Sequence, residues 1–224
     1  SLDVTHTQLV TASATQARLM AERANASKIT FPSWLLEDKK DPHVANSLLL
    51  QEQLFNSRQS SLQSELGAID ENIAGLNYQL QGLEASMINK KEQQKLVKEQ
   101  VENIRDLAKE GFIARNRLLD TERTYAQINA GISEDLGNLG RVKRQLAELK
   151  LRKVQRVQEY QKDVRTQLSE AQRESDAQAS RLKVYKQELE HASIKAPVDG
   201  TIFGLNIFTK GGVVQSGTKL MELT

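Results

Sequence analysis

Apolar residues recur along most of this chain at alternating intervals of three and four positions. The first series runs without a break, and its positions are Leu48, Glu52, Phe55, Gln59, Leu62, Leu66, Ile69, Ile73, Leu76, Leu80, Leu83, Met87, Lys90, Gln94, Val97, Val101, Ile104 and Ala108. The second includes one extra four-residue step, and its positions are Leu118, Thr121, Tyr125, Ile128, Ile132, Asp135, Leu139, Val142, Leu146, Val154, Val157, Val164, Leu168, Ala171, Leu182, Tyr185 and Leu189. This heptad spacing is typical of a helix that packs along another helix. It predicts two long helices, over 43–110 and 116–192.

A short segment separates the two predicted helices. The sequence "AKEGFIARN", at 108–116, interrupts the heptad pattern, and Gly111 can adopt the left-handed conformation that often ends a helix. Two helices joined by a turn of residues 111–115 should fold back on each other as an antiparallel hairpin. Positions whose numbers sum to about 226 then face each other, and Lys90 lies opposite Asp135. We expect these two residues to form a polar pair within the apolar seam.

The charges of the two predicted arms are complementary. Residues 61–85 carry four acidic and no basic residues, whereas the facing residues 141–165 carry nine basic and three acidic residues. This distribution favours the antiparallel hairpin over parallel self-association. Across the whole chain 31 Lys and Arg balance 29 Asp and Glu, so the protein has no general attraction for nucleic acid. We interpret the basic segment as a coiled-coil flank and expect no nucleic-acid partner.

A third helix is predicted near the N-terminus, over residues 4–28. The residues spaced along one side of it are Leu9, Ala12, Gln16 and Leu19. A linker with two prolines follows at 29–42. The lengths of the arms indicate that this first helix packs against the base of the hairpin as a third strand of the coiled coil. Six glycines inside the arms lie beside the seams, and either close approach of a neighbouring hairpin or tolerated flexibility would explain them: Gly67, Gly75, Gly82, Gly131, Gly137 and Gly140.

Composition favours an extended molecule without catalytic chemistry. Hydrophobic residues make up 38% of the chain and aromatic residues 4%, which is little for a compact core. There is no cysteine, and His6, His43 and His191 are too scattered to suggest a metal site. No phosphate-binding glycine loop or nucleophile motif is present, so we predict no enzyme activity and no cofactor. Without an apolar run of 18 residues or a signal-peptide pattern, the sequence as written is expected to be soluble.

Residues 193–224 have a different character. In "KAPVDGTI" and "GGVVQSGTKLMEL", short apolar runs alternate with Gly and Pro turns, which predicts short strands. This order of short strands and turns resembles half of a biotinyl or lipoyl carrier domain. However, none of Lys195, Lys210 and Lys219 lies in the hairpin-turn sequence that surrounds a modified lysine. A half-domain needs a second half to cover its apolar face, and residues 1–3 look like the end of one. The predicted fold is therefore mainly α, a long antiparallel coiled-coil hairpin with an extra N-terminal helix, inserted in a small lipoyl-like β half-domain.

Three features together resemble the HlyD-type membrane fusion proteins. They are the insertion of a hairpin into a lipoyl-like domain, the segment "LAKEGFIARNRLLDTERTYAQ" at 107–127, and the ending "IKAPVDGTIFGLNIFTKGGVVQSGTKLMEL" at 194–223. The long arms and the Gly-Gly-Val-Val ending are most similar to the branch of type I secretion that exports proteases and lipases. The alternatives are a multidrug-efflux adaptor and, in another class, a structural coiled-coil protein without a transport role.

The resemblance implies an adaptor in the periplasm of a Gram-negative bacterium. Such an adaptor links an inner-membrane ABC exporter to a TolC-like outer-membrane channel, and a ring of copies, six by resemblance, surrounds the secreted polypeptide in transit. In full-length relatives a transmembrane helix precedes this region and a β-barrel domain follows it. The resemblance therefore implies that this sequence is the periplasmic region of a protein anchored in the inner membrane.

By the same resemblance, the hairpin tip contacts the channel through an arginine, a leucine four residues on, and a serine or threonine seven residues beyond that. This chain keeps Leu107, whereas Asn103 and Ala114 stand at the other two positions, and Arg105 or Arg115 could replace the arginine. The candidate docking residues are Leu107, Glu110, Gly111, Phe112, Ile113, Ala114 and Arg115.

The turn also draws attention without reference to any family. Phe112 and Ile113 are apolar residues in a turn that should face solvent, and such loop residues often mark a binding surface. The alternative is that they only close the end of the hydrophobic seam.

Overall fold

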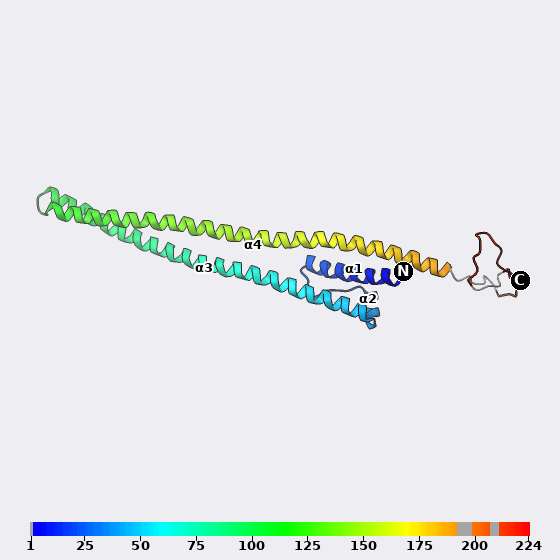
Figure 1. The fold of residues 1–224 in the computed structure, drawn as a ribbon. Coiled ribbons are helices and arrows are strands. Elements are labelled where there is room, and N and C mark those ends of the chain that lie inside the picture. Colours follow the sequence, from blue (N-terminus) through cyan, green and yellow to red (C-terminus); the bar gives the residue numbers. More distant parts are fainter. Residues whose placement is uncertain (1, 192–198, 207–210) are drawn as a thin grey trace.

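A computed structural model describes residues 2–191, 199–206 and 211–224, and shows a long rod made of helices (Figure 1). Its elements in chain order are α1 (Leu2–Arg23), α2 (Ser33–Glu37), the 3-10 turn η1 (Asp38–Lys40), α3 (Pro42–Lys109), α4 (Arg115–His191), β1 (Ile202–Phe203) and β2 (Glu222–Leu223). With 68 and 77 residues at about 1.5 Å each, α3 and α4 are roughly 100 and 115 Å long. The predicted helical hairpin with an additional N-terminal helix is confirmed.

The start of α3 follows from its local sequence. The carboxylate of Asp41 caps the helix by accepting a hydrogen bond of 2.8 Å from the backbone N–H of His43. Pro42 occupies the first turn, where its missing N–H costs no helical hydrogen bond. The long helix therefore begins at a defined residue, one position before the predicted start of the arm.

The predicted seam of α3 is confirmed over most of its length. Every predicted position from Leu62 to Ala108 is partly or fully shielded from solvent. Near the base the prediction is wrong at two positions, because Glu52 and Gln59 are exposed. Their neighbours Gln51 and Arg58 face the interior instead, and both bind side chains of other helices. These polar contacts replace apolar packing at the point where the three helices meet.

Ion pairs link the arms along the rod. From tip to base they are Arg105–Glu122 at 2.7 Å, Lys90–Asp135 at 2.8 Å, Glu84–Lys143 at 4.0 Å, Asp70–Lys153 at 2.6 Å, Glu65–Arg156, and Arg58–Asp163 at 2.8 Å. Three of them join the acidic segment 61–85 to the basic segment 141–165, as predicted. The paired residue numbers sum to 105 + 122 = 227 near the tip and 58 + 163 = 221 near the base. The mirror rule of about 226 therefore holds near the tip and shifts gradually toward the base.

The seam of α4 departs from prediction in its middle part. Val154 and Val157 were expected in the seam but are exposed, Val154 by 52%. Lys153 and Arg156 lie between the arms instead and reach Asp70 and Glu65. Long basic side chains can cover apolar surface with their methylene stems while the charged heads form ion pairs. Farther along, the shielded positions resume at Tyr160 and continue to Leu182, but the last two predicted seam positions, Tyr185 and Leu189, are exposed.

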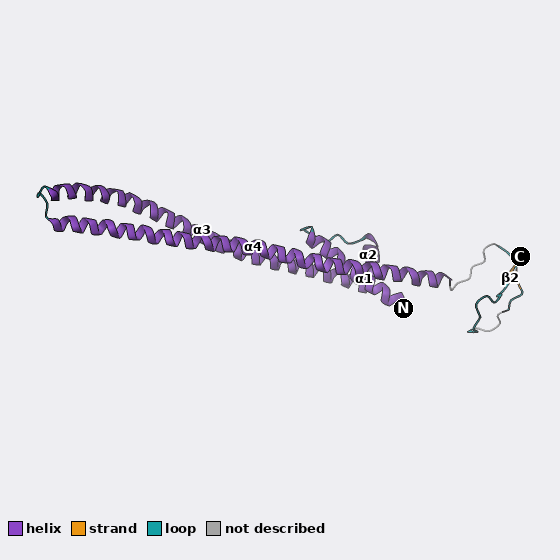
Figure 2. Ribbon diagram, turned by 90° about the horizontal axis from the view of Figure 1, so that it is seen from above, coloured by secondary structure: helices purple, strands orange, loops and turns teal. Residues whose placement is uncertain are grey.

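The first helix is wedged between the arms at the base. Figure 1 shows α3 and α4 diverging there, with α1 lying between them, and α1 contacts both arms (Figures 1 and 2). Helix α1 runs toward the tip, antiparallel to α4, and the following segment returns to the base before α3 begins. The predicted third helix at the base is thus present, and it separates the two arms.

Two apolar clusters hold α1 on opposite sides. The cluster toward α3 consists of Val10, Ala14, Ala17, Phe31, Leu35, Val44 and Leu48. The cluster toward α4 consists of Leu19, Tyr160, Val164, Leu168 and Ala171, with Leu62 packed against it. Because Phe31 and Leu35 come from the segment after α1, the predicted linker 29–42 also contributes to the core. It contains the two short helical elements α2 and η1.

A network of charged side chains closes the wedge near the C-terminal end of α1. The buried carboxylate of Glu22 accepts hydrogen bonds from Arg18 at 2.5 Å and from Arg58 of α3 at 3.2 Å. Arg18 also donates to Gln51 at 2.7 Å, and the guanidinium of Arg58 lies 5.3 Å from the ring centre of Tyr160 on α4. Burial, reinforced by Glu22, raises the pKa of Tyr160. All three helices are therefore tied together at one height of the rod.

The boundaries of α1 also differ from prediction. Leu2 and Asp3, which were expected to end a strand, already lie in the first turn of α1, and the helix ends at Arg23 instead of residue 28. Asn25, just beyond, has a positive φ of 50°. This left-handed residue reverses the chain earlier than the composition indicated.

The C-terminal segment forms a small ladder in its described part. Strands β1 and β2 pair antiparallel, with Ile202 opposite Leu223. The backbone N–H of Thr224 donates to the carbonyl of Thr201 at 3.1 Å, and that of Asn206 donates to Leu220 at 2.9 Å. The described residues of 193–224 do not make up a lipoyl-like domain, and the predicted strand start around Lys195 and the loop at Lys210 fall outside the described residues.

Replacing Leu19 by alanine should destabilise the base. Leu19 is fully buried between α1 and α4, so Leu19→Ala should lower the free energy of unfolding by about 2–5 kcal/mol. The matched control is Leu136→Ala, in an exposed position of α4, which should change it by no more than about 0.5 kcal/mol. Denaturant titration followed by circular dichroism measures both values. Equal losses for the two variants would contradict the wedge.

Candidate docking tip

The turn between α3 and α4 closes the tip with a defined hydrogen-bond pattern. The N–H of Gly111 donates to the carbonyl of Ala108 at 3.2 Å, and that of Phe112 donates to Leu107 at 3.0 Å. Glu110 caps the helix and Gly111 has a φ of +85°. Two such bonds around a left-handed residue constitute a Schellman motif, in which glycine avoids the strain that a Cβ would introduce. The expected role of Gly111 is confirmed, and the turn comprises residues 110–114.

The tip presents apolar side chains to solvent. Phe112 is 75% exposed and Leu107 is also exposed, whereas Ile113 is half-buried. The seam is already closed one turn below the tip by the buried Val101 and Ile104. Closure of the seam therefore explains Ile113 in part but does not explain Phe112. Ala114 and Arg115, the other predicted docking residues, are exposed.

A groove of about 470 Å³ lies beside the turn. Its lining comes from both arms and consists of Leu96, Glu99, Gln100, Asn103, Ile104, Ile113 and Arg117. Leu96, Ile104 and Ile113 give it an apolar part, to which the exposed Leu96 contributes most, and the amides of Gln100 and Asn103 give it a polar part. Of the residues predicted for docking, the groove includes Ile113. Arg117, in the first turn of α4, was missed by the sequence analysis.

The charged residues of the tip are mostly paired within the hairpin. Arg105 binds Glu122 at 2.7 Å, and this contact raises the pKa of the Arg105 guanidinium. Lys109 and Arg123 approach Asp106 and Asp120 at 3.5 and 3.6 Å. In the described tip, three charged side chains between residues 103 and 123 have no ion pair: Glu110, Arg115 and Arg117.

The predicted polar pair in the seam is confirmed and is more extensive than expected. Asp135 is only 7% exposed, and its carboxylate binds Lys90 at 2.8 Å and Ser86 at 2.9 Å. Lys90 also donates to the carbonyl of Gly131 at 3.3 Å, and a Cβ at Gly131 would lie 3.4 Å from the Lys90 nitrogen. Contact with Lys90 and Ser86 lowers the pKa of Asp135. The pair thus fixes the register of the arms at one height.

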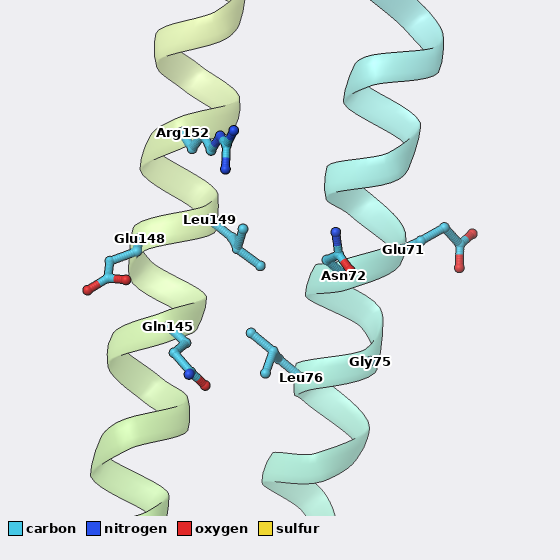
Figure 3. Close-up of a pocket in the computed structure, with 8 residues that line it drawn as sticks. All are labelled: Glu71, Asn72, Gly75, Leu76, Gln145, Glu148, Leu149 and Arg152. Carbon is cyan, nitrogen blue, oxygen red and sulfur yellow. The ribbon is translucent and has the colours of Figure 1, made fainter.

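A second groove of about 640 Å³ runs beside the seam near the middle of the rod (Figure 3). Leu76 and Leu149 point toward each other across the arms, and Glu71 and Glu148 point away (Figure 3). Gly75 widens the groove, since a Cβ there would meet nothing within 4 Å. These are the contacts of two packed helices, and they bring no nucleophile together with a base.

The described residues contain no group of three or more His, Asp or Glu side chains placed to hold a metal ion. None of the helices in this part of the chain combines the length and the apolar character that crossing a bilayer requires.

A two-armed hairpin more than about 100 Å long, with a third helix at its base and an apolar turn at its tip, makes this chain a long helical-hairpin protein. The family described as "AprE, long alpha-helical hairpin" matches residues 1–188, and the chain belongs to this family.

Curated relatives come from protein secretion systems. The chain is 40% identical over 208 residues to the alkaline protease secretion protein AprE of Pseudomonas aeruginosa, covering 93% of this chain and 48% of the relative. It is 35% identical over 210 residues to the proteases secretion protein PrtE of Dickeya chrysanthemi, covering 94% and 47%. The chain therefore spans about half the length of the curated relatives it matches.

Two solved structures share the fold. The crystal structure of the soluble domain of LipC, a membrane fusion protein of a type I secretion system, has 40% sequence identity and a TM-score of 0.92, covering all of this chain and 84% of that one. The periplasmic adaptor protein EmrA has 19% identity and a TM-score of 0.58, covering 88% and 62%. At that identity EmrA supports the fold alone.

Replacing glycine by alanine should change the stability of the hairpin in opposite directions at two kinds of position. Gly111→Ala introduces a Cβ at φ +85° and should destabilise the hairpin by about 1 kcal/mol. Gly137→Ala, inside α4 with open space around it, should stabilise the helix by up to about 1 kcal/mol. Thermal unfolding of both variants distinguishes them, and a stabilised Gly111→Ala would contradict the described turn.

The Lys90–Asp135 pair should make the stability of the hairpin decrease in acid. Because the pKa of Asp135 is lowered in the folded state, its contribution is present above the ordinary value of 3.8 and is lost as the pH falls through the lowered pKa. Asp135→Asn should therefore unfold at a lower temperature than the unaltered chain at pH 7, and the difference should shrink in acid. Asp176→Asn, at an exposed residue without an ion pair in the described chain, is the control. A difference that grows in acid would contradict the assignment.

Proposed function

We propose that this chain is the periplasmic hairpin region of an adaptor in type I secretion. The adaptor links an inner-membrane ABC exporter to a TolC-like outer-membrane channel, and it has no catalytic role of its own. The observation that carries the proposal is the close similarity of the whole chain to the soluble domain of LipC, combined with an exposed apolar tip at the far end of the rod. The relatives are named for the secretion of proteases, which favours protein export over multidrug efflux.

The tip is the part that we assign to the channel. Its exposed Phe112 and Leu107 and its half-buried Ile113 present apolar surface that the hairpin itself does not cover. The arms place this surface roughly 100 Å from the base, which suits a contact with a second membrane. The chain would act in a ring of copies, six by family resemblance, that surrounds the secreted polypeptide.

The terminal ladder is proposed to be half of a lipoyl-like module. Ile202 and Phe203 are 54% and 45% exposed, and the described part of this segment pairs two strands. An isolated pair of strands is marginal in water, and its apolar residues need a cover. A further segment of the full-length protein, located before α1 in the sequence, would complete the module and bring the base of the rod toward the inner membrane.

Charges at the apolar tip should weaken docking without unfolding the hairpin. In the full-length protein, Leu107→Asp and Ile113→Asp should weaken channel binding by at least about tenfold and reduce export of the substrate, because an unpaired carboxylate would enter the contact. Pull-down of the channel and secreted-substrate assays measure the two effects.

The matched control is Leu136→Asp, which places the same charge at an exposed apolar position far from the tip. Circular dichroism of each variant shows whether the helices persist. Normal export by well-folded tip variants would refute the docking role.

A further inference from the structure

The tip holds cations that the hairpin itself does not neutralise. Arg105, Lys109 and Arg123 each have an acidic partner on the hairpin, whereas Arg115 and Arg117 have none among the described residues. A guanidinium keeps its charge at any physiological pH and can bind a carboxylate through two parallel hydrogen bonds. Free arginines at a surface that should contact another protein are therefore available to recognise an anion.

Of the two free arginines, Arg117 is placed beside the apolar part of the tip. It lines the groove that also contains Ile104 and Ile113, whereas Arg115 does not line it. The amides of Gln100 and Asn103 add hydrogen-bonding groups to the same wall. Glu99 lies in this groove too, but no ion pair joins it to Arg117 in the described structure.

The position of Arg105 makes it a poor substitute for a docking arginine. Its guanidinium already binds Glu122 across the two arms at 2.7 Å. Using it for a partner would break this pair and leave Glu122 without its cation. The geometry therefore favours Arg117 over both of the arginines that the sequence offered.

We propose that the groove at the tip is a composite recognition site in which the exposed Leu96 and the half-buried Ile113 receive an apolar side chain and Arg117 binds an adjacent carboxylate. The proposal rests on the proposed function, because the partner is the rim of the outer-membrane channel. It adds the chemistry of that rim: an acidic residue next to an exposed aliphatic or aromatic residue. Charge complementarity supports this occupant, because Arg117 is the cation that lines the groove and has no ion pair among the described residues.

The test measures binding of the 1–224 chain to the purified cognate channel at several salt concentrations. Arg117→Glu should weaken binding by about tenfold or more and flatten its salt dependence. Arg117→Lys keeps the positive charge but loses the planar guanidinium, so its affinity should lie between those of the unaltered chain and Arg117→Glu. Arg141→Glu makes the same charge change at an exposed position of the middle of α4 and should alter binding by less than about twofold. Replacing acidic residues of the channel rim by lysine, one at a time, should restore binding of Arg117→Glu at one position.

The outcomes separate the two proposals. If the unaltered chain does not bind the channel, the proposed docking function fails and this inference fails with it. If the unaltered chain binds and Arg117→Glu binds equally well, docking stands and the composite site is wrong. Equal losses for Arg117→Glu and Arg115→Glu, with no rescue by any rim substitution, would show a general attraction by the tip and would also overturn the site.

A single cysteine gives an independent measurement in cells. Residues 1–224 contain no cysteine, so Phe112→Cys places the one cysteine of this region at the tip of the full-length protein. Disulfide cross-linking to cysteines placed along the channel rim should peak beside the acidic residue that rescues Arg117→Glu. Cross-links confined to other parts of the rim would contradict the proposed pairing.

Discussion

The burial of α1 between the two arms is the interaction on which the shape of the rod depends. Leu19 packs against α4, and the small residues Ala14 and Ala17 allow close packing on the other side. Where α1 ends, the buried carboxylate of Glu22 binds two arginines. A buried charge is tolerated only when it is paired and hydrogen-bonded, so the three helices can meet at this height in few other ways. Removing α1 would leave the diverging arms with uncovered apolar faces.

Above this junction the arms depend on each other alone. Their heptad seam provides the packing, and the ion pairs on its flanks match acidic positions of α3 to basic positions of α4. A seam of uniform leucines could slip by one heptad at little cost. The pair Lys90–Asp135 prevents this, because a slipped register would leave the nearly buried Asp135 among apolar side chains.

The hairpin could be predicted from the sequence because the heptad spacing, the turn glycine and the mirrored charges all agree. The position of α1 between the arms could not be predicted from the sequence. A helix with two partners buries two faces, and the alanines on one of these faces give only a weak hydrophobic pattern. Val154 and Val157 were placed in the seam because apolar residues usually occupy it, but Lys153 and Arg156 reach acidic partners there. At the tip, Gly111 and Phe112 could be predicted from the turn. Arg117 emerged only once the partners of the other arginines were known.

The rod is three helices thick at its base and two helices thick beyond Glu22. Resistance to bending rises steeply with the thickness of a beam, so elastic deformation concentrates in the thinner part. The free end of this lever sweeps a wider arc than the base, and bending is expected mainly along the two-helix arms. A load applied at the tip should therefore bend the arms and leave the packing of the three-helix junction little changed.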